Sequence, residues 1–127
     1  MVHTITNPNR EHITACIAIN AAGGALPVYY IFKGQRRTPA LLNALDKDQF
    51  SMTESGFVTK MAWKDWVRFY LSNISPPEKR NWVLLILDGF GCHGNDPETL
   101  ELLEKNKVYE PSIFLENRLI HCKYFFR

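Results

Sequence analysis

The feature that most constrains this chain is a short, continuously apolar run that ends in an acidic residue. Residues 82–87 (WVLLIL) are uncharged, and Asp88 and the glycine-rich segment 89–94 follow them directly. Such a run suits a strand that is buried on both faces in the middle of a sheet. Asp88 then emerges at the carboxyl end of the strand, where open α/β sheets bind ligands. We therefore expect a central strand here and treat Asp88 as the first candidate site residue.

Two more strands and a long helix are predicted before this run. Residues 12–20 alternate with period two, and residues 26–33 are rich in aromatic and β-branched side chains. The glycine-containing turn at 20–24 joins them, which predicts an antiparallel hairpin. Residues 59–74 carry an apolar stripe at helical spacing and end before two prolines. Residues 35–56 are less regular, and we interpret them as a loop with one helical turn.

The order of predicted elements indicates an α/β fold. After the apolar run, Asp96 and Pro97 are typical of a helix start, and that helix extends to Asn106. Val108 and Tyr109 are expected to begin a further strand. Strands and helices in this order predict a mixed sheet with flanking helices.

Composition excludes several classes of protein. The chain has 127 residues, 46% of them apolar, and a net charge of +2, which suits a single domain with a core and not a disordered tail. Its longest uncharged apolar run is far shorter than the ~20 residues that span a bilayer. Arg10 interrupts the apolar core that a secretory signal would need, so we expect an intracellular protein. Cys16 lies in an alternating apolar run and is expected in the core.

The glycines after Asp88 also allow a nucleotide-binding interpretation. Gly89-x-Gly91-x-x-Gly94 matches the dinucleotide fingerprint, and Glu110 lies near the spacing of its ribose-binding acid. Against this, Asp88 would place negative charge beside the pyrophosphate, and Asp96 begins the helix only after the third glycine. Too little chain follows Glu110 for the remaining units of that fold.

A row of cations on the predicted helix is the candidate nucleic-acid surface. Lys60, Lys64 and Arg68 share one helical face at four-residue spacing, where they could neutralise phosphates or form an ordinary solvated face. Further cations flank this helix in the sequence: Arg36, Arg37, Lys79 and Arg80. Trp63 and Trp66 lie on the apolar stripe and are expected to be core residues, not platforms for stacking bases.

Five segments, in this order and spacing, resemble one known family. They are REHITACIAINAAG at 10–23, LP at 26–27, YIFKG at 30–34, GFVT at 56–59 ahead of Trp66, and LLILDG at 84–89 with His93. Together they resemble the DDE superfamily endonuclease domain of pogo- and Tigger-type transposases and their jerky-like relatives. The resemblance covers about residues 9–106, and residues 107–127 form a divergent tail.

The resemblance implies an RNase H-like fold, a nuclear location and metal-dependent cleavage and joining of DNA. The family uses two divalent ions, Mg²⁺ or Mn²⁺, held by three acids. Asp88 would be the middle acid and a metal ligand, and His93 matches a histidine expected near the scissile phosphate. Lys60, Lys64 and Arg68 would then contact the DNA partner.

Departures from the family pattern predict a partial domain. Residues 1–10 hold no acid where the family's first aspartate would precede the hairpin, and no aspartate follows Asp96. Phe90 and Cys92 replace polar residues of the loop after the middle acid. We therefore expect residues 1–127 to be one RNase H-like domain, incomplete at both ends, that does not cut DNA alone. The alternative from another class is a domesticated module that binds DNA or protein.

Overall fold

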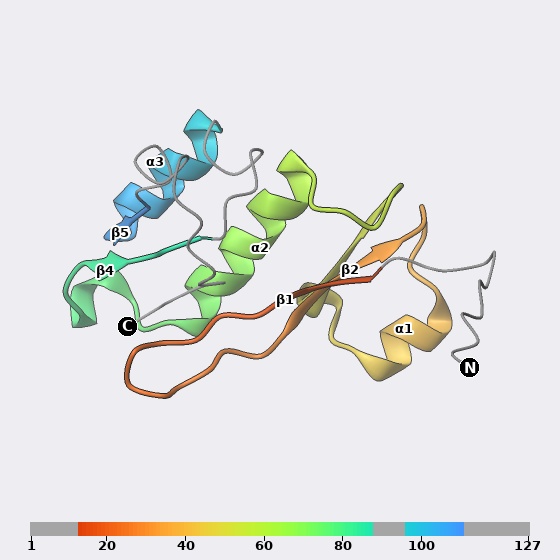
Figure 1. The fold of residues 1–127 in the computed structure, drawn as a ribbon, viewed down its shortest axis with the longest axis horizontal. Coiled ribbons are helices and arrows are strands. Elements are labelled where there is room, and N and C mark those ends of the chain that lie inside the picture. Colours follow the sequence, from red (N-terminus) through yellow and green to blue (C-terminus); the bar gives the residue numbers. More distant parts are fainter. Residues whose placement is uncertain (1–12, 88–95, 111–127) are drawn as a thin grey trace, which may run out of the picture.

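The structure is a computed structural model that describes residues 13–87 and 96–110 (Figure 1). Asp88, His93, the motif from Gly89 to Gly94 and residues 111–127 lie outside the described residues. The described elements, in chain order, are β1 (Ile13–Cys16), β2 (Tyr29–Lys33), α1 (Pro39–Ala44), η1 (Lys47–Gln49), β3 (Phe50–Thr53), α2 (Lys60–Asn73), η2 (Pro77–Lys79), β4 (Val83–Leu84), α3 (Pro97–Lys105) and β5 (Val108–Tyr109).

The predicted hairpin is confirmed. Strands β1 and β2 pair antiparallel, with Cys16 opposite Tyr29. In the connecting turn, the Asn20 Oδ1 atom accepts hydrogen bonds from the backbone N–H groups of Ala22 and Gly24, at 3.1 and 2.7 Å. Gly23 has a φ of 91°, a conformation that glycine adopts without steric cost. Side chain and glycine together close the turn that sets the register of the two strands.

The segment 35–56 contains more regular structure than the predicted loop with one helical turn: the helical turn is observed, but a strand was not expected. It forms α1, the short 3₁₀ turn η1 and the strand β3, which pairs parallel to β2 with Tyr30 opposite Phe50. The sequence of β3, FSMT, alternates apolar and polar side chains over only four residues, which is too short a run to stand out from the polar segment around it. Because β3 is parallel and β1 antiparallel to β2, the sheet is mixed, as predicted.

Helix α2 is the centre of the core. Thr59 caps it, its hydroxyl accepting a hydrogen bond from the Ala62 N–H at 3.2 Å. The predicted apolar stripe is buried, and the rings of Trp63 and Trp66 stack with centroids 5.1 Å apart. Trp66 stacks in turn on Tyr70 at 5.2 Å. The expectation that both tryptophans are core residues is confirmed.

Strand β4 differs from the prediction of burial on both faces. Val83 and Leu85 are buried, at 3% and 0% exposure, whereas Trp82 and Leu84 are 57% and 50% exposed among the described residues. β4 pairs parallel with β5, with Val83 opposite Val108, and the buried side chains of both strands belong to the core cluster around α2. An apolar run alone does not predict whether one or both faces of a strand are buried. Here only the face of Val83 and Leu85 packs against the helices.

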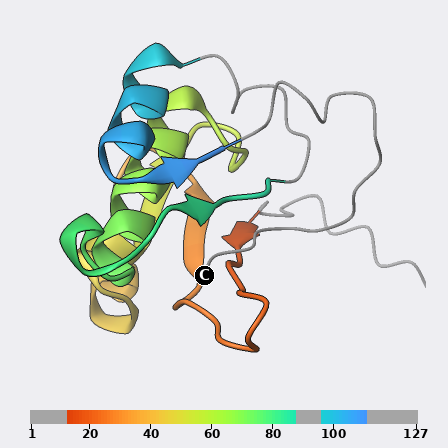
Figure 2. The same ribbon diagram turned by 90° about the vertical axis from the view of Figure 1, so that its left-hand side faces the viewer.

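The described helices lie on one side of the strands. Figure 2 shows α1, α2 and α3 gathered on the same side of β1, β2 and β4. Buried residues from β1, β2, β4, β5, α2 and α3 form a single cluster, which includes the predicted core residue Cys16. Within the two described stretches, no helix is long and apolar enough to cross a membrane.

We expect Leu103→Ala to lower the free energy of unfolding by about 2–5 kcal/mol, because a buried leucine truncation leaves a cavity. Leu103 is 1% exposed in the core cluster. The control Leu42→Ala, at a leucine of α1 that is 48% exposed, should change the same quantity by less than about 0.5 kcal/mol. Urea unfolding of both variants measures the difference, and equal effects would contradict the assigned core.

Candidate functional site

The strand–helix–strand order predicted around Asp88 is observed, but β4 pairs with β5 alone among the described strands and is not the expected central strand. Leu87, 8% exposed, is the last described residue before the segment 88–95, and α3 begins at Pro97 directly after it. The next strand, β5, is parallel to β4, so α3 is the crossover helix of a strand–helix–strand unit. Ligands of such units bind at the carboxyl ends of the strands. Asp88 and His93 themselves lie outside the described residues.

The start of α3 bears on the nucleotide-binding interpretation. The helix begins at Pro97 with Asp96 as its N-cap, as the sequence predicted. In the dinucleotide fingerprint the third glycine packs against the sheet from within the helix, whereas Gly94 precedes this helix. The observed helix start therefore weighs against a pyrophosphate bound by the glycine motif.

Metal-ligating residues do not gather elsewhere in the described structure. In residues 13–87 and 96–110, no group of three or more His, Cys, Asp or Glu side chains is placed to hold a metal ion. Glu110 directly follows β5, and its Oε1 atom is buried. The donor set for a divalent ion is thus not assembled from the described residues alone.

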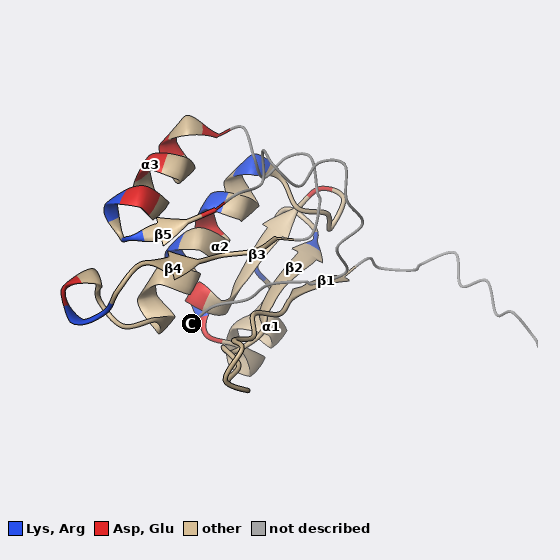
Figure 3. Cartoon of the chain, turned by 60° about the vertical axis from the view of Figure 1, so that its left-hand side comes forward, with Lys and Arg blue, Asp and Glu red and all other residues tan. Residues whose placement is uncertain are grey.

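Two of the three cations on the candidate nucleic-acid surface already have acidic partners. Lys64 donates a hydrogen bond to Glu98 Oε2 at 2.6 Å, and this ion pair joins α2 to α3. Arg68 Nη1 lies 3.6 Å from Asp65 Oδ1, one helical turn away. Figure 3 shows the resulting neighbourhood, with Lys and Arg on α2 beside the acidic residues of α3. Lys60 is exposed and lies at the N-terminal end of α2.

The electrostatics at the start of α3 follow from the same cations. The Thr99 hydroxyl, which donates a hydrogen bond to Asp96 Oδ2 at 2.5 Å, is the main cause that lowers the pKa of Asp96. The positive charges of Lys64 and Lys60 lower this pKa further. The N-terminal end of α2 therefore faces an ionised carboxylate, which reduces its net positive potential.

A hollow of about 260 Å³ lies between α2 and α3. Its charged lining residues include three cations, Lys64, Arg68 and Lys105, and two acids, Glu98 and Glu101. Because both positive and negative side chains line it, this hollow is as compatible with a solvated interface between two helices as with a contact to one phosphate.

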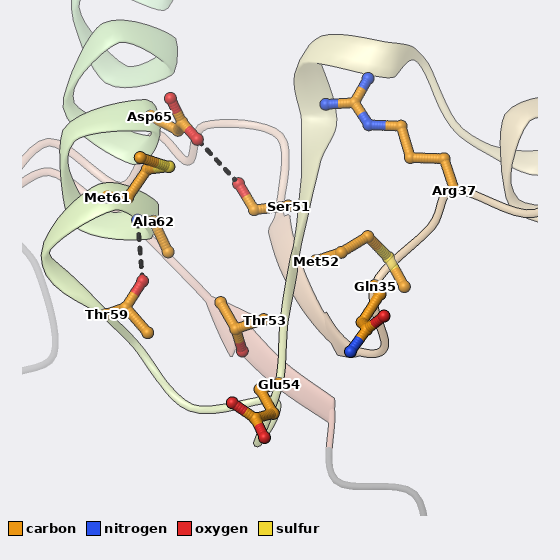
Figure 4. A pocket seen from close by; sticks show the side chains of 10 residues that line it. All are labelled: Gln35, Arg37, Ser51, Met52, Thr53, Glu54, Thr59, Met61, Ala62 and Asp65. Carbon is orange, nitrogen blue, oxygen red and sulfur yellow. Dashed lines mark hydrogen bonds between the residues drawn. The ribbon is translucent and has the colours of Figure 1, made fainter.

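A second hollow, of about 320 Å³, was not foreseen from the sequence (Figure 4). It lies between β3 and the first turns of α2, and Ser51, Asp65 and Arg37 line it. Ser51 donates a hydrogen bond to Asp65 Oδ2 at 3.4 Å, and its hydroxyl is also hydrogen-bonded to that of Tyr29. The sequence carried only a weak signal for this hollow, because β3 itself was missed.

The polar groups of this second hollow have structural partners. The Arg37 guanidinium lies 4.9 Å from the centroid of the Phe50 ring and donates a hydrogen bond to the Phe50 carbonyl at 3.5 Å. Burial raises the pKa of Tyr29 to about 12, so its hydroxyl stays protonated and serves as a hydrogen-bonding group, not as a base. Hydrogen bonds within the fold thus hold the Arg37 and Ser51 side chains at this hollow.

Two of the other flanking cations also have structural roles. Arg80 donates hydrogen bonds to the carbonyls of Asn106 and Lys107, at 2.5 and 3.2 Å, and so caps the C-terminal end of α3. Its Nε atom donates to the Ser75 carbonyl at 2.6 Å. With Arg37 on the Phe50 ring and Arg80 at the end of α3, both guanidinium groups hold the fold together.

Comparison with known proteins identifies one family. The sequence pattern of the DDE superfamily endonucleases matches residues 10–111, more than half of the chain. The chain is also similar to "MFS-type transporter clz9" of Cochliobolus lunatus, with 27% identity over 103 residues. That match covers 80% of this chain and 11% of the relative, so the chain spans about a tenth of the relative's length. No solved structure matches.

The buried tyrosines give the described core a predictable response to alkaline pH. Burial raises the pKa of both Tyr29 and Tyr70 from 10.0 to about 12. Because each pKa is higher in the folded than in the unfolded chain, the stability linked to each neutral hydroxyl is fully present below about pH 10. It is lost as the pH rises from about 10 to about 12.

We therefore expect phenolate absorbance to show two tyrosines that ionise late or only on unfolding. Tyr29→Phe and Tyr70→Phe should each remove one late-ionising group. If either variant leaves the late phase unchanged, the corresponding burial is wrong.

Proposed function

Because this chain belongs to the DDE superfamily endonuclease family, we propose that it derives from a transposase and acts on DNA through a site at the end of β4. The observation that carries the proposal is the family match over residues 10–111, which spans the apolar strand, Asp88 and α3. The unit formed by β4, α3 and the parallel β5 supports it, because a carboxylate after such a strand sits on a rigid base. An RNase H-like arrangement and a nuclear location belong to the same proposal.

Asp88 is proposed as a ligand of Mg²⁺ or Mn²⁺. Hard divalent cations prefer carboxylate oxygens, and Mg²⁺ tolerates little error in their position. The buried residues Leu85 and Leu87 restrict the backbone that leads to Asp88 and so favour a fixed carboxylate. When bound, a pair of such ions activates the attacking oxygen and stabilises the leaving oxygen in phosphoryl transfer. His93, which follows in the same segment, is proposed to lie near the phosphate that is cut.

We propose that these 127 residues do not cleave DNA by themselves. Holding two ions requires several carboxylates, and Asp88 is the one acid of this chain that matches the family motif. Among the described residues no cluster of acids offers a substitute. The other carboxylates would have to come from outside this stretch of sequence.

The face of α2 is proposed to contact the DNA backbone. Lys60 is exposed and Arg68 is 61% exposed at its side chain, so both can reach a phosphate. Lys64 is bonded to Glu98 and is 24% exposed, so it is expected to contribute less than the other two. The second candidate is a domesticated module that binds DNA or a protein through this face. The mixed charge between α2 and α3 favours this candidate if the affinity for DNA proves weak.

We expect charge reversal on α2 to weaken DNA binding. In fluorescence anisotropy with duplex DNA, Lys60→Glu and Arg68→Glu should each reduce affinity several-fold. Each should also lower the slope of log affinity against log salt by about one, since each removes one phosphate contact. Lys47→Glu is the matched control, because it changes the net charge equally at an exposed lysine of η1. Equal losses in all three variants would contradict a specific contact on α2.

We expect the full chain to leave a supercoiled plasmid intact in the presence of Mg²⁺ or Mn²⁺. The physical reason is that a single matching carboxylate cannot hold two ions. Agarose gels that follow conversion to the nicked form measure this. Nicking that disappears in Asp88→Ala would show that the proposed incompleteness is wrong, while it would support the assignment of Asp88.

A further inference from the structure

The strands carry an apolar surface on the side away from the helices. We call it the outer sheet face. Its members are large apolar side chains, each 42–57% exposed among the described residues: Ile13, Ile17, Ile19, Trp82, Leu84 and Tyr109. They come from the first hairpin, from β4 and its preceding residue, and from β5. An exposed apolar surface built from several strands marks a site that something covers.

The alternation of side chains along each strand shows that these residues share one face. Along β4 and β5, Val83, Leu85 and Val108 are buried in the cluster around α2, while Leu84 and Tyr109 point away from it. In the first hairpin, Cys16 and Ala18 belong to the same cluster, and their neighbours are exposed. All described helices lie on the buried side of the strands (Figure 2).

The outer sheet face is also nearly free of charge. The strands β1, β4 and β5, with the sequences ITAC, VL and VY, contain no charged residue. Figure 3 shows these strands in tan, the colour of residues other than Lys, Arg, Asp and Glu, in contrast to the blue and red segments of α2 and α3. A partner that binds through phosphates or ion pairs would therefore find little to contact here, whereas an apolar segment would be complementary.

One segment of this chain fits that requirement. Residues 111–127 begin two positions after Tyr109, which is the last residue of β5 and a member of the outer sheet face. They contain eight large apolar side chains: Ile113, Phe114, Leu115, Leu119, Ile120, Tyr124, Phe125 and Phe126. Adjacent strands are about 4.8 Å apart and an extended chain advances about 3.3 Å per residue, so the segment is long enough to cross the strands.

We propose that residues 113–126 of the same chain cover the outer sheet face and complete the core on that side. The contact would bury both the apolar side chains of the segment and those of the face, at roughly 25 cal/mol per Å² of apolar surface removed from water. It gives the divergent tail a structural function that does not depend on DNA binding or on Asp88.

Trp82 provides a direct readout in the full chain. It is 57% exposed in the described structure, whereas Trp63 and Trp66 are each 2% exposed. If the segment covers the face, acrylamide should quench the tryptophan fluorescence of the native chain weakly. The tail variant Leu119→Asp/Ile120→Asp should increase the quenching constant several-fold, and the additional substitution Trp82→Phe should abolish that increase. Strong quenching in the native chain would overturn the proposal.

Trypsin tests the same contact from the side of the segment. Arg118 and Lys123 lie within it, and their cleavage should be at least about tenfold slower in the native chain than in Leu84→Asp, because proteolysis follows the population of the open form. The control Leu42→Asp, at an equally exposed leucine of α1, should leave these two cleavage rates unchanged. Equal rates in the native chain and Leu84→Asp would overturn the proposal.

Light scattering after size-exclusion chromatography shows whether the outer sheet face is covered by residues 113–126 of the same chain or by a second copy of the chain. Protection of Trp82 in a monomer, independent of protein concentration, supports the proposal. Protection that appears only with a dimer mass would show that another copy covers the face and would overturn it. If Leu84→Asp does not fold, the quenching of Trp82 in the native chain still tests whether the outer sheet face is covered.

Discussion

The contact on which the rest of the described structure depends is the packing of the buried face of α2 against strands from both sheets. Trp63, Trp66 and Tyr70 stack in sequence along this face, and Tyr29 and Leu85 join the same cluster from β2 and from the residue after β4. Aromatic side chains of this size bury a large apolar area and fix relative orientation through ring stacking. Without this helix the three-stranded sheet and the β4–β5 pair would have no common core.

This packing also determines what the candidate site can be. The buried residues after β4 hold the backbone that leads to Asp88, and α3 returns the chain to the parallel strand β5. The cations of α2 face α3, where Glu98 and Asp96 reduce their potential. A family of metal-dependent nucleases supplies the chemical interpretation, and membership of that family rests on the match over residues 10–111. The proposed chemistry thus needs the carboxylate of Asp88, which follows the described residues of this unit in the sequence, and further carboxylates from elsewhere.

The sequence predicted the elements whose signals are local and periodic. The stripe on α2, the Asn20 turn and the start of α3 at Asp96 and Pro97 are all encoded in neighbouring residues, and all were confirmed. Strand β3 was missed because the alternation in FSMT spans only four residues, and the strand is held in place by pairing with β2. Two features depend on tertiary packing: the burial of only one face of β4, and the pairing of Lys64 with Glu98. The neighbouring residues in the sequence carry no signal for either feature.

The proposed chemistry depends most on the proposed binding of a divalent metal ion by Asp88, beyond the end of β4. Paramagnetic broadening by Mn²⁺ in the nuclear magnetic resonance spectrum of the full chain tests it most directly. At low Mn²⁺ the amide signals of Leu87 and Asp88 should lose intensity first, because they are covalently nearest to the carboxylate, and the Leu87 signal should recover in Asp88→Asn. Broadening centred on Glu98, Glu101 and Glu104 of α3, and unchanged in Asp88→Asn, would show that the ion does not bind at Asp88.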